Sequence, residues 1–179
     1  MQYEAESQAG FACRTAASYT LPMAGSDEQF MRVALAQAGE AGAAGEVPVG
    51  AVLVRNGEIV AAGRNGPIGR CDPTSHAEVE ALRAGGRALH DYRLGDSTLY
   101  VTLEPCLMCA AAIVHARVAR VVFGAWDPRA GAAGSLLDAF RLPGLNHRVD
   151  VFGGVLADEC QAVLRDFFAA RRSGGAAER

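Results

Sequence analysis

Two short segments of this 179-residue chain combine residue types that bind metals and transfer protons. In PTSHAEVE, His76 stands two residues before Glu78, and in EPCLMCA, Cys106 and Cys109 are spaced as C-x-x-C. Zinc takes three protein ligands and one open position in catalytic sites, and four protein ligands in structural sites. His76, Cys106 and Cys109 supply three, which predicts a catalytic zinc centre with Glu78 beside it.

Two other interpretations of the cysteine pair stay open at this point. No fourth ligand lies at a convenient spacing, although Cys71 and His90 remain formally available for a structural site. Alone, C-x-x-C also fits a redox pair. Pro105 before the pair suits a helix start, where the helix dipole favours the thiolates that a metal needs.

Glu78 also has two interpretations. Ser75-x-x-Glu78 matches a capping box, in which the carboxylate only ties down a helix end. Beside a zinc ligand, the carboxylate can instead take a proton from water and return it to a leaving amine. Zinc lowers the pKa of its bound water to about 7, which makes that water a nucleophile. H-x-E followed by P-C-x-x-C is the signature of zinc nucleobase deaminases, so we favour the role of proton shuttle.

The elements that must position these residues can be read from apolar runs and turn signals. Strands are expected at 47–54, 58–64, 97–103, 118–125 and 147–153. Helices are expected from about Ser26 to Gly42, from Ser75 to Gly85, from Cys106 to Ala116, near Leu136 and from Ala157 to Arg172. Asn56-Gly57 predicts a hairpin between the first two strands, and the proline-containing segment 65–74 predicts a loop. Later strands alternate with helices, which indicates an α/β protein with a mixed sheet covered on both faces.

Length and composition fit one domain: 50% of residues are hydrophobic and 21% are charged. No apolar run reaches the roughly eighteen residues that span a bilayer, and the N-terminal segment does not resemble a secretory signal. The five cysteines are irregularly spaced, which indicates a reduced, cytoplasmic protein. We expect a flexible extension at 1–24, with Met23 as a candidate natural start, one zinc-dependent deaminase domain over 25–173, and a flexible tail at 174–179.

The net charge of −3 excludes binding of nucleic acid through overall charge alone. A nucleic-acid partner would have to be held by a local basic surface. The C-terminal third carries the candidates, Arg117, Arg120, Arg129, Arg141, Arg148, Arg165, Arg171 and Arg172. A solvated, salt-bridged surface would have the same composition.

From about Asp27 to Arg172 the sequence resembles the bacterial tRNA-specific adenosine deaminases. The matching stretches are EVPVGAVLV, NGPIGRCDPTSHAE, YVTLEPCLMCAAAI, RVVFGA, GAAGSL, NHRV and LADEC with LRDFF. H-A-E with P-C-x-x-C is shared with guanine, cytosine and deoxycytidylate deaminases. GAAGS, NHRV and DFF are more particular to the tRNA enzymes.

The resemblance implies a cytidine-deaminase-like three-layer α/β/α fold with a central mixed five-stranded sheet, one Zn²⁺ per subunit and a homodimer. The lack of a long apolar run predicts no membrane partner. It also implies hydrolytic deamination of adenosine to inosine at the wobble position of an arginine tRNA, with the anticodon stem–loop as partner. By the same resemblance, His76, Cys106 and Cys109 hold zinc and Glu78 shuttles protons. Substrate contacts are implied for Asn65 and the backbone of Ala77 at the flipped base or its ribose, and for Asp127, Arg129, Asn146, Phe168 and Arg172 near the anticodon loop.

Some of these outer residues have plain structural interpretations. Asp127-Pro128 also fits a turn start, Asn146 also fits a loop-backbone contact, and one of the adjacent Phe167 and Phe168 is expected in the core. Four positions depart from the family pattern at the substrate rim, namely Arg64, Gly66, Trp126 and Pro128. His115 is expected to be packed or at a dimer interface. The competing functions are a guanine or free-nucleotide deaminase, a structural zinc module and a redox C-x-x-C protein.

Overall fold

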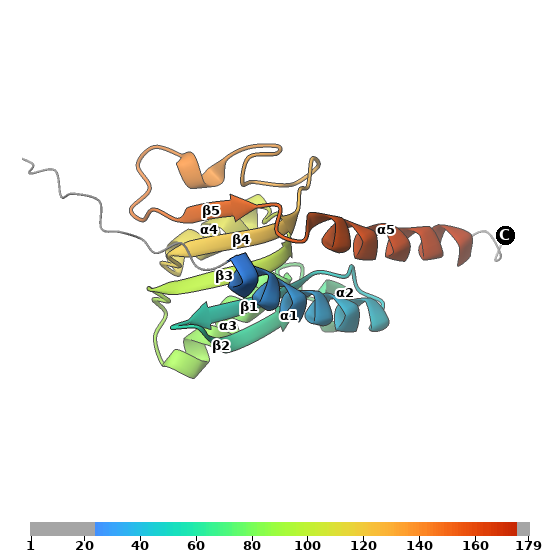
Figure 1. The fold of residues 1–179 in the computed structure, drawn as a ribbon, viewed down its shortest axis with the longest axis horizontal. Coiled ribbons are helices and arrows are strands. Elements are labelled where there is room, and N and C mark those ends of the chain that lie inside the picture. Colours follow the sequence, from blue (N-terminus) through green and yellow to red (C-terminus); the bar gives the residue numbers. More distant parts are fainter. Residues whose placement is uncertain (1–23, 175–179) are drawn as a thin grey trace, which may run out of the picture.

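A computed structural model of the chain describes residues 24–174. Five strands form one sheet in the order β2-β1-β3-β4-β5 (Figure 1). They are β1 (Gly50–Arg55), β2 (Glu58–Arg64), β3 (Ser97–Leu103), β4 (Arg120–Ala125) and β5 (Asp150–Gly153). β1 pairs antiparallel with β2 and β3, whereas β3, β4 and β5 run parallel to one another. The predicted mixed sheet is confirmed.

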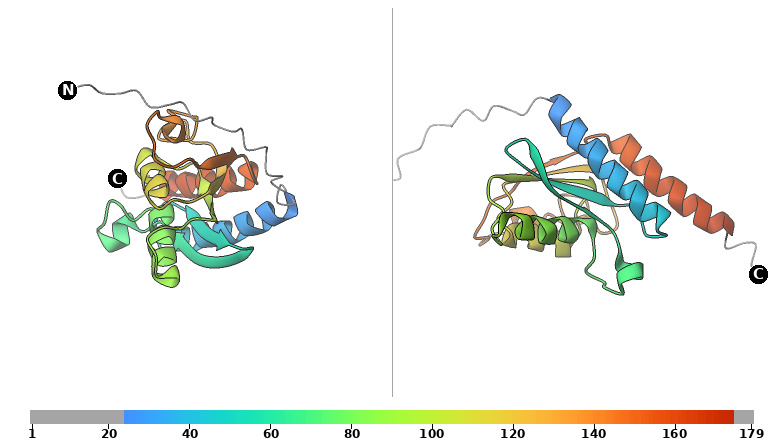
Figure 2. Two further views of the ribbon diagram at one scale, coloured as in Figure 1. Left: turned by 90° about the vertical axis from the view of Figure 1, so that its left-hand side faces the viewer. Right: turned by 90° about the horizontal axis from the view of Figure 1, so that it is seen from below.

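The helices cover both faces of this sheet. They are α1 (Ala24–Ala43), α2 (Pro67–Arg70), α3 (Ala77–Leu89), α4 (Leu107–His115), the 3₁₀ helix η1 (Ala139–Arg141) and α5 (Ala157–Gly174). α1 and α5 lie side by side on one face, and α3 and α4 lie on the other (Figure 2). The three-layer α/β/α architecture is therefore the one that the sequence predicts.

Side chains alternate between two cores, as the period of a strand requires. Val52, Tyr100 and Val122 point to the layer of α1 and α5, where Met31 and Cys160 meet them. The intervening strand residues point to the layer of α3 and α4; they include Leu53, Leu99, Val101, Val121 and Phe123, which pack on Ala81 and Ile113. The second layer also carries the residues predicted to bind metal, so one of the two cores supports the chemistry.

Three boundaries differ from the sequence expectation. α3 continues past Gly85 to Leu89. Gly85 does not end the helix; it gives room to a neighbouring strand, since a Cβ there would lie 2.4 Å from Leu53 Cδ2. Pro67 starts the short helix α2 inside the expected loop, a position that proline tolerates. The short helix expected near Leu136 lies instead at Ala139–Arg141.

Among residues 24–174, no helix combines the length and apolar character needed to cross a bilayer. The extension expected at 1–24, its candidate start Met23 and the tail expected at 174–179 lie outside the described residues, apart from the helix ends Ala24 and Gly174. Those expectations stay predictions.

Candidate active site

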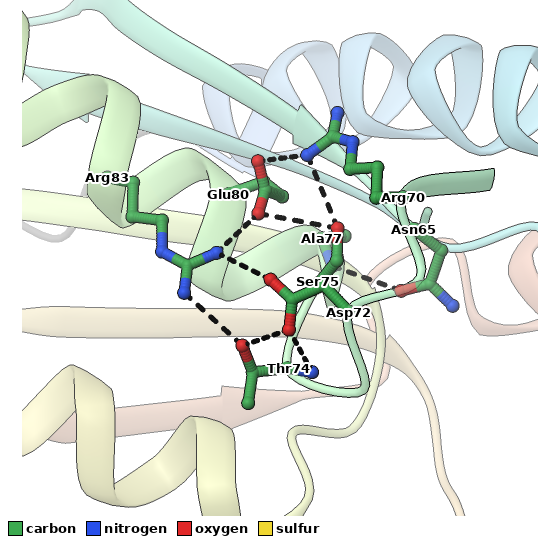
Figure 3. A network of polar contacts seen from close by, with 8 residues as sticks. All are labelled: Asn65, Arg70, Asp72, Thr74, Ser75, Ala77, Glu80 and Arg83. Carbon is green, nitrogen blue, oxygen red and sulfur yellow. Dashed lines mark hydrogen bonds and ion pairs between the residues drawn. The ribbon is translucent and has the colours of Figure 1, made fainter. Parts of the chain in front are cut away.

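His76 is the N-cap residue of α3 and stands between a loop and the first helical turn. The loop side is fixed by Asn65, whose Oδ1 accepts a hydrogen bond from the Ala77 N–H at 3.0 Å (Figure 3). This side chain satisfies one of the amide groups that a helix start leaves without a partner. Asn65 therefore orients the helix turn that carries His76.

A network of charged side chains holds the same loop against α3 (Figure 3). Glu80 forms ion pairs with Arg70, the last residue of α2, and, at 2.8 Å, with Arg83 one turn further along α3. Arg83 also contacts Asp72 at 3.4 Å, and Asp72 accepts the Thr74 N–H at 2.8 Å. Because the pairs share partners, the segment before His76 is fixed at several points.

α3 lies directly on strand β2 at Gly63. A Cβ at Gly63 would lie 2.3 Å from the Ala77 carbonyl oxygen and 2.4 Å from the Ala81 nitrogen. Only glycine allows this approach, which sets the depth of the turn that carries His76 and Glu78.

The two cysteines come from the start of α4, as predicted. Cys106 is its N-cap residue, and Cys109 is fully buried in the first turn. The Ala110 N–H donates to the Cys106 carbonyl at 2.8 Å, which closes the first helical turn. The positive end of the helix dipole therefore faces both sulfurs.

His76 Nδ1 lies 3.6 Å from the Cys106 sulfur and 3.5 Å from the Cys109 sulfur. Tetrahedral zinc, with Zn–S of about 2.3 Å and Zn–N of about 2.0–2.1 Å, requires an N···S separation of about 3.6 Å. Within residues 24–174, these three residues form the one group of side chains spaced to hold a metal ion. Cys71 is exposed, and His90 stands at the opposite end of α3 from His76, so neither serves as a fourth ligand.

Protonation of the sulfurs also fits a cation site. The hydrogen bond from Cys109 and the contact with His76 lower the pKa of Cys106 to about 4. The same hydrogen bond, together with burial, raises the pKa of Cys109. The two sulfurs therefore share one proton. A cation bound between them would replace that proton and hold both sulfurs as thiolates.

Glu78 stands two residues after His76, in the first turn of α3, and is only 4% exposed. Burial raises its pKa to about 7, and the neighbouring Cys106 sulfur acts in the same direction. The capping-box interpretation is excluded, because the N-cap is His76 and the Ser75 N–H donates to the Asp72 carbonyl at 3.1 Å. A buried carboxylate beside a metal group is placed for proton transfer.

Comparison with known proteins agrees with this geometry. Residues 24–125 match the model of the cytidine and deoxycytidylate deaminase zinc-binding region. The tRNA-specific adenosine deaminase of Haemophilus influenzae is 52% identical over 82% of this chain and 85% of its own length. This chain belongs to the tRNA-specific adenosine deaminase family. A solved structure from a study of tRNA:A34 deaminases shares 44% identity, with a TM-score of 0.74 over 76% of this chain and 99% of that one. A guanine deaminase of Nitrosomonas europaea shares the fold at 25% identity, with a TM-score of 0.68 over 79% of this chain and 84% of that one.

In this family member, four of the five residues expected near the anticodon loop line one hollow of about 580 Å³ between α5 and the loop after β4. They are Asp127, Arg129, Phe168 and Arg172. Phe168 is 44% exposed, whereas Phe167 is the more buried of the pair. Among residues 24–174, neither Arg129 nor Arg172 forms an ion pair.

Asp127 also starts a turn, as its structural interpretation predicts. Its Oδ1 accepts the N–H groups of Arg129 at 2.9 Å and Ala130 at 3.3 Å. Asn146 is not brought to this hollow. It lines a separate one with His115 of α4, and its carbonyl accepts a hydrogen bond from Arg117.

Sequence reasoning missed Glu104 of the deaminase, a carboxylate that is only 2% exposed. It accepts hydrogen bonds from the N–H groups of Asp127 (2.9 Å), Ala133 (2.9 Å) and Ser135 (3.0 Å). The Ser135 hydroxyl donates as well, and these bonds outweigh burial and lower the pKa of Glu104. The carboxylate therefore shapes the loop that borders the hollow. A single signal, an acidic residue that ends a buried strand, was available in the sequence.

Proposed function

We propose that this protein deaminates adenosine to inosine at the wobble position of the anticodon of an arginine tRNA. One observation carries the proposal: the loop that contacts the metal-binding turn at Pro105 and Cys106 also borders a hollow that presents Arg129, Arg172 and an exposed aromatic ring. The relatives named as tRNA-specific adenosine deaminases support the choice of substrate.

The residues of the chain divide the work of the reaction. His76, Cys106 and Cys109 would hold zinc, which when bound acts as a Lewis acid and activates water for attack. Glu78 takes a proton from the attacking water and delivers a proton to the leaving amine, so that adenosine and water give inosine and ammonia. Asn65 and the backbone of Ala77 lie at the start of α3 beside Glu78 and orient the flipped base or its ribose.

The hollow suits an RNA loop. Unpaired bases of RNA loops are splayed out and bound by aromatic stacking and by contacts to phosphates and 2′-hydroxyls. Phe168 supplies a ring, while Arg129 and Arg172 supply local positive charge on a chain whose net charge is −3. A guanine deaminase needs no such surface, because a free base fills only the pocket at the metal.

The proposal is tested by a deamination assay on a synthetic arginine-tRNA anticodon stem–loop, beside free adenosine, cytidine and guanine. We expect inosine in the stem–loop alone, and no product from a stem–loop whose wobble base is guanosine. Turnover of guanine with none on RNA would contradict the proposed substrate and leave the metal chemistry standing.

We also propose that the protein is a cytoplasmic homodimer. The outer face of α3 and α4 supports the dimer, since it carries an apolar hollow of about 400 Å³ bordered by Val79, Leu82 and the exposed Tyr92. The four described cysteines are free, which fits a reducing compartment. Analytical ultracentrifugation should give twice the mass of the chain, and Tyr92→Glu should shift it towards the monomer. A monomeric wild type would refute the dimer.

A further inference from the structure

Trp126 is the single tryptophan of the chain and is 51% exposed. It follows β4 directly and lines the same hollow as Arg129, Phe168 and Arg172. The proposed function gives it no role, and the family pattern has a smaller or basic residue there. A large exposed indole inside a substrate hollow calls for a physical reason.

The buried part of the indole is held on several sides. Its ring meets Phe123, which is fully buried, edge to face with centroids 4.7 Å apart and planes at 90°. A Cβ at Gly153 would lie 2.8 Å from its Cζ2 carbon, so β5 packs closely against it, and Gly134 lies on the Cζ3 side. These contacts bury one part of the indole and fix its orientation. The rest of its surface is exposed and borders the hollow.

The loop that carries Trp126 is tied to the metal-binding turn. The Ala132 N–H donates to the Pro105 carbonyl at 2.8 Å, and Gly131 forms a β-bridge with Cys106. The next residue, Asp127, is fixed through its N–H by Glu104. The position of the indole is thus coupled to the position of the predicted zinc ligands through backbone contacts and the side chain of Glu104.

We propose that Trp126 stacks on an unpaired base of the anticodon loop next to the adenosine that reacts. The inference rests on the proposed function and assigns a substrate-holding residue to it. A rigid, half-open aromatic surface binds any base through its π face, and arginines beside it bind the phosphates that flank that base. Trp126 and Phe168 then supply two stacking surfaces to the same hollow, one from the loop after β4 and one from α5.

The test uses the indole as its own reporter, because the chain holds no other tryptophan. The full-length protein is titrated with a stem–loop that carries inosine, the product, at the wobble position. Binding is followed in parallel by the anisotropy of a fluorophore on the RNA. Stacking of a base on the indole quenches its emission, so we expect quenching that saturates together with the anisotropy. A hairpin with the same stem and a non-nucleotide linker in place of the loop should leave the emission unchanged.

Variants separate stacking from packing. Trp126→Ala should raise the Kd for the stem–loop by roughly 5- to 150-fold, the range expected for loss of one base–aromatic stack, while Trp126→Phe should recover most of the affinity. Zinc content should stay at the wild-type level in both, which shows that the fold is intact. Phe152→Leu is the matched control, since Phe152 is a 44% exposed aromatic of β5 that packs against Arg120 outside the hollow. Its Kd should not change.

The outcomes are distinguishable. RNA that binds without quenching the indole, or a Trp126→Ala variant that binds as tightly as wild type, overturns the stacking role and leaves the proposed function intact. A protein that binds no stem–loop at all overturns the proposed function together with this inference.

Discussion

Replacing Gly63 by alanine tests whether the depth of α3 on the sheet sets the metal site. The added Cβ would lie 2.3 Å from the Ala77 carbonyl oxygen, where ordinary contact begins near 3.4 Å. The start of α3 must therefore retreat by about 1 Å, and it carries His76 and Glu78 with it. Overpacking of this kind costs about 1–3 kcal/mol of folding free energy, or roughly 2–12 °C in Tm for a domain of this size. A displacement of about 1 Å also costs on the order of 100-fold in turnover.

The assay combines thermal unfolding, zinc content and single-turnover deamination of the stem–loop. Gly39→Ala is the control: Gly39 is exposed within α1, four residues before the helix ends at Ala43, and no atom lies within 4 Å of its added Cβ. That variant should be as stable as wild type or up to about 1 kcal/mol more stable, because alanine favours a helix over glycine. The reasoning is refuted if Gly63→Ala matches wild type in Tm, zinc content and turnover, since the backbone would then have room that the structure denies.

Three further changes follow from the site and its surroundings. Glu78→Gln should retain zinc and lose about 10²–10⁴-fold in kcat, and a variant of wild-type rate would remove Glu78 from proton transfer. Cys106→Ala should lose both zinc and stability, because metal-binding energy is also folding energy, whereas Cys71→Ala at an exposed thiol should lose neither. Full metal content in Cys106→Ala would disprove the ligand assignment. Burial raises the pKa of Asp27, but hydrogen bonds from Arg120 and Tyr100 and the charge of Arg120 together outweigh burial and lower this pKa below 3.8. The stabilising effect of Asp27 should therefore be complete above pH 3.8 and be lost as the pH falls through the lower pKa of the folded state. In denaturant unfolding, the difference between wild type and Asp27→Asn should therefore shrink in acid; a constant difference would contradict the ion pair.

Most of the fold could be predicted because its elements carry their own signals. The five strands are apolar runs bounded by turn residues, and the alternation of later strands with helices leaves few other arrangements. The predicted end of α3 was wrong because a glycine such as Gly85, taken alone, is typical of a helix terminus. Its actual role, to admit the side chain of Leu53 from a neighbouring strand, depends on a contact between distant segments.

The metal site could be predicted for a different reason. Zinc accepts few kinds of ligand at few spacings, so the types and spacing of His76, Cys106 and Cys109 can be recognised in two short segments of the sequence. The only local sign of Glu104 is an acidic residue at the end of a buried strand, and its role stays hidden because its partners stand 23 to 31 residues further along the chain. The expected placement of Asn146 beside the other RNA-loop residues has no support within one subunit, where it lies against α4.

The carboxylate of Glu104 fixes the backbone of a loop without relying on the side chains of the residues that it binds through their N–H groups. It binds main-chain N–H groups of the segment after β4, and such bonds do not depend on which side chains those residues carry. Substitution of Trp126, Pro128 or Arg129 therefore leaves the Glu104 hydrogen bonds available, so the backbone beside the metal-binding turn can stay in place. Side chains of this loop can thus be changed one at a time without removing the hydrogen bonds that hold its backbone against Pro105 and Cys106.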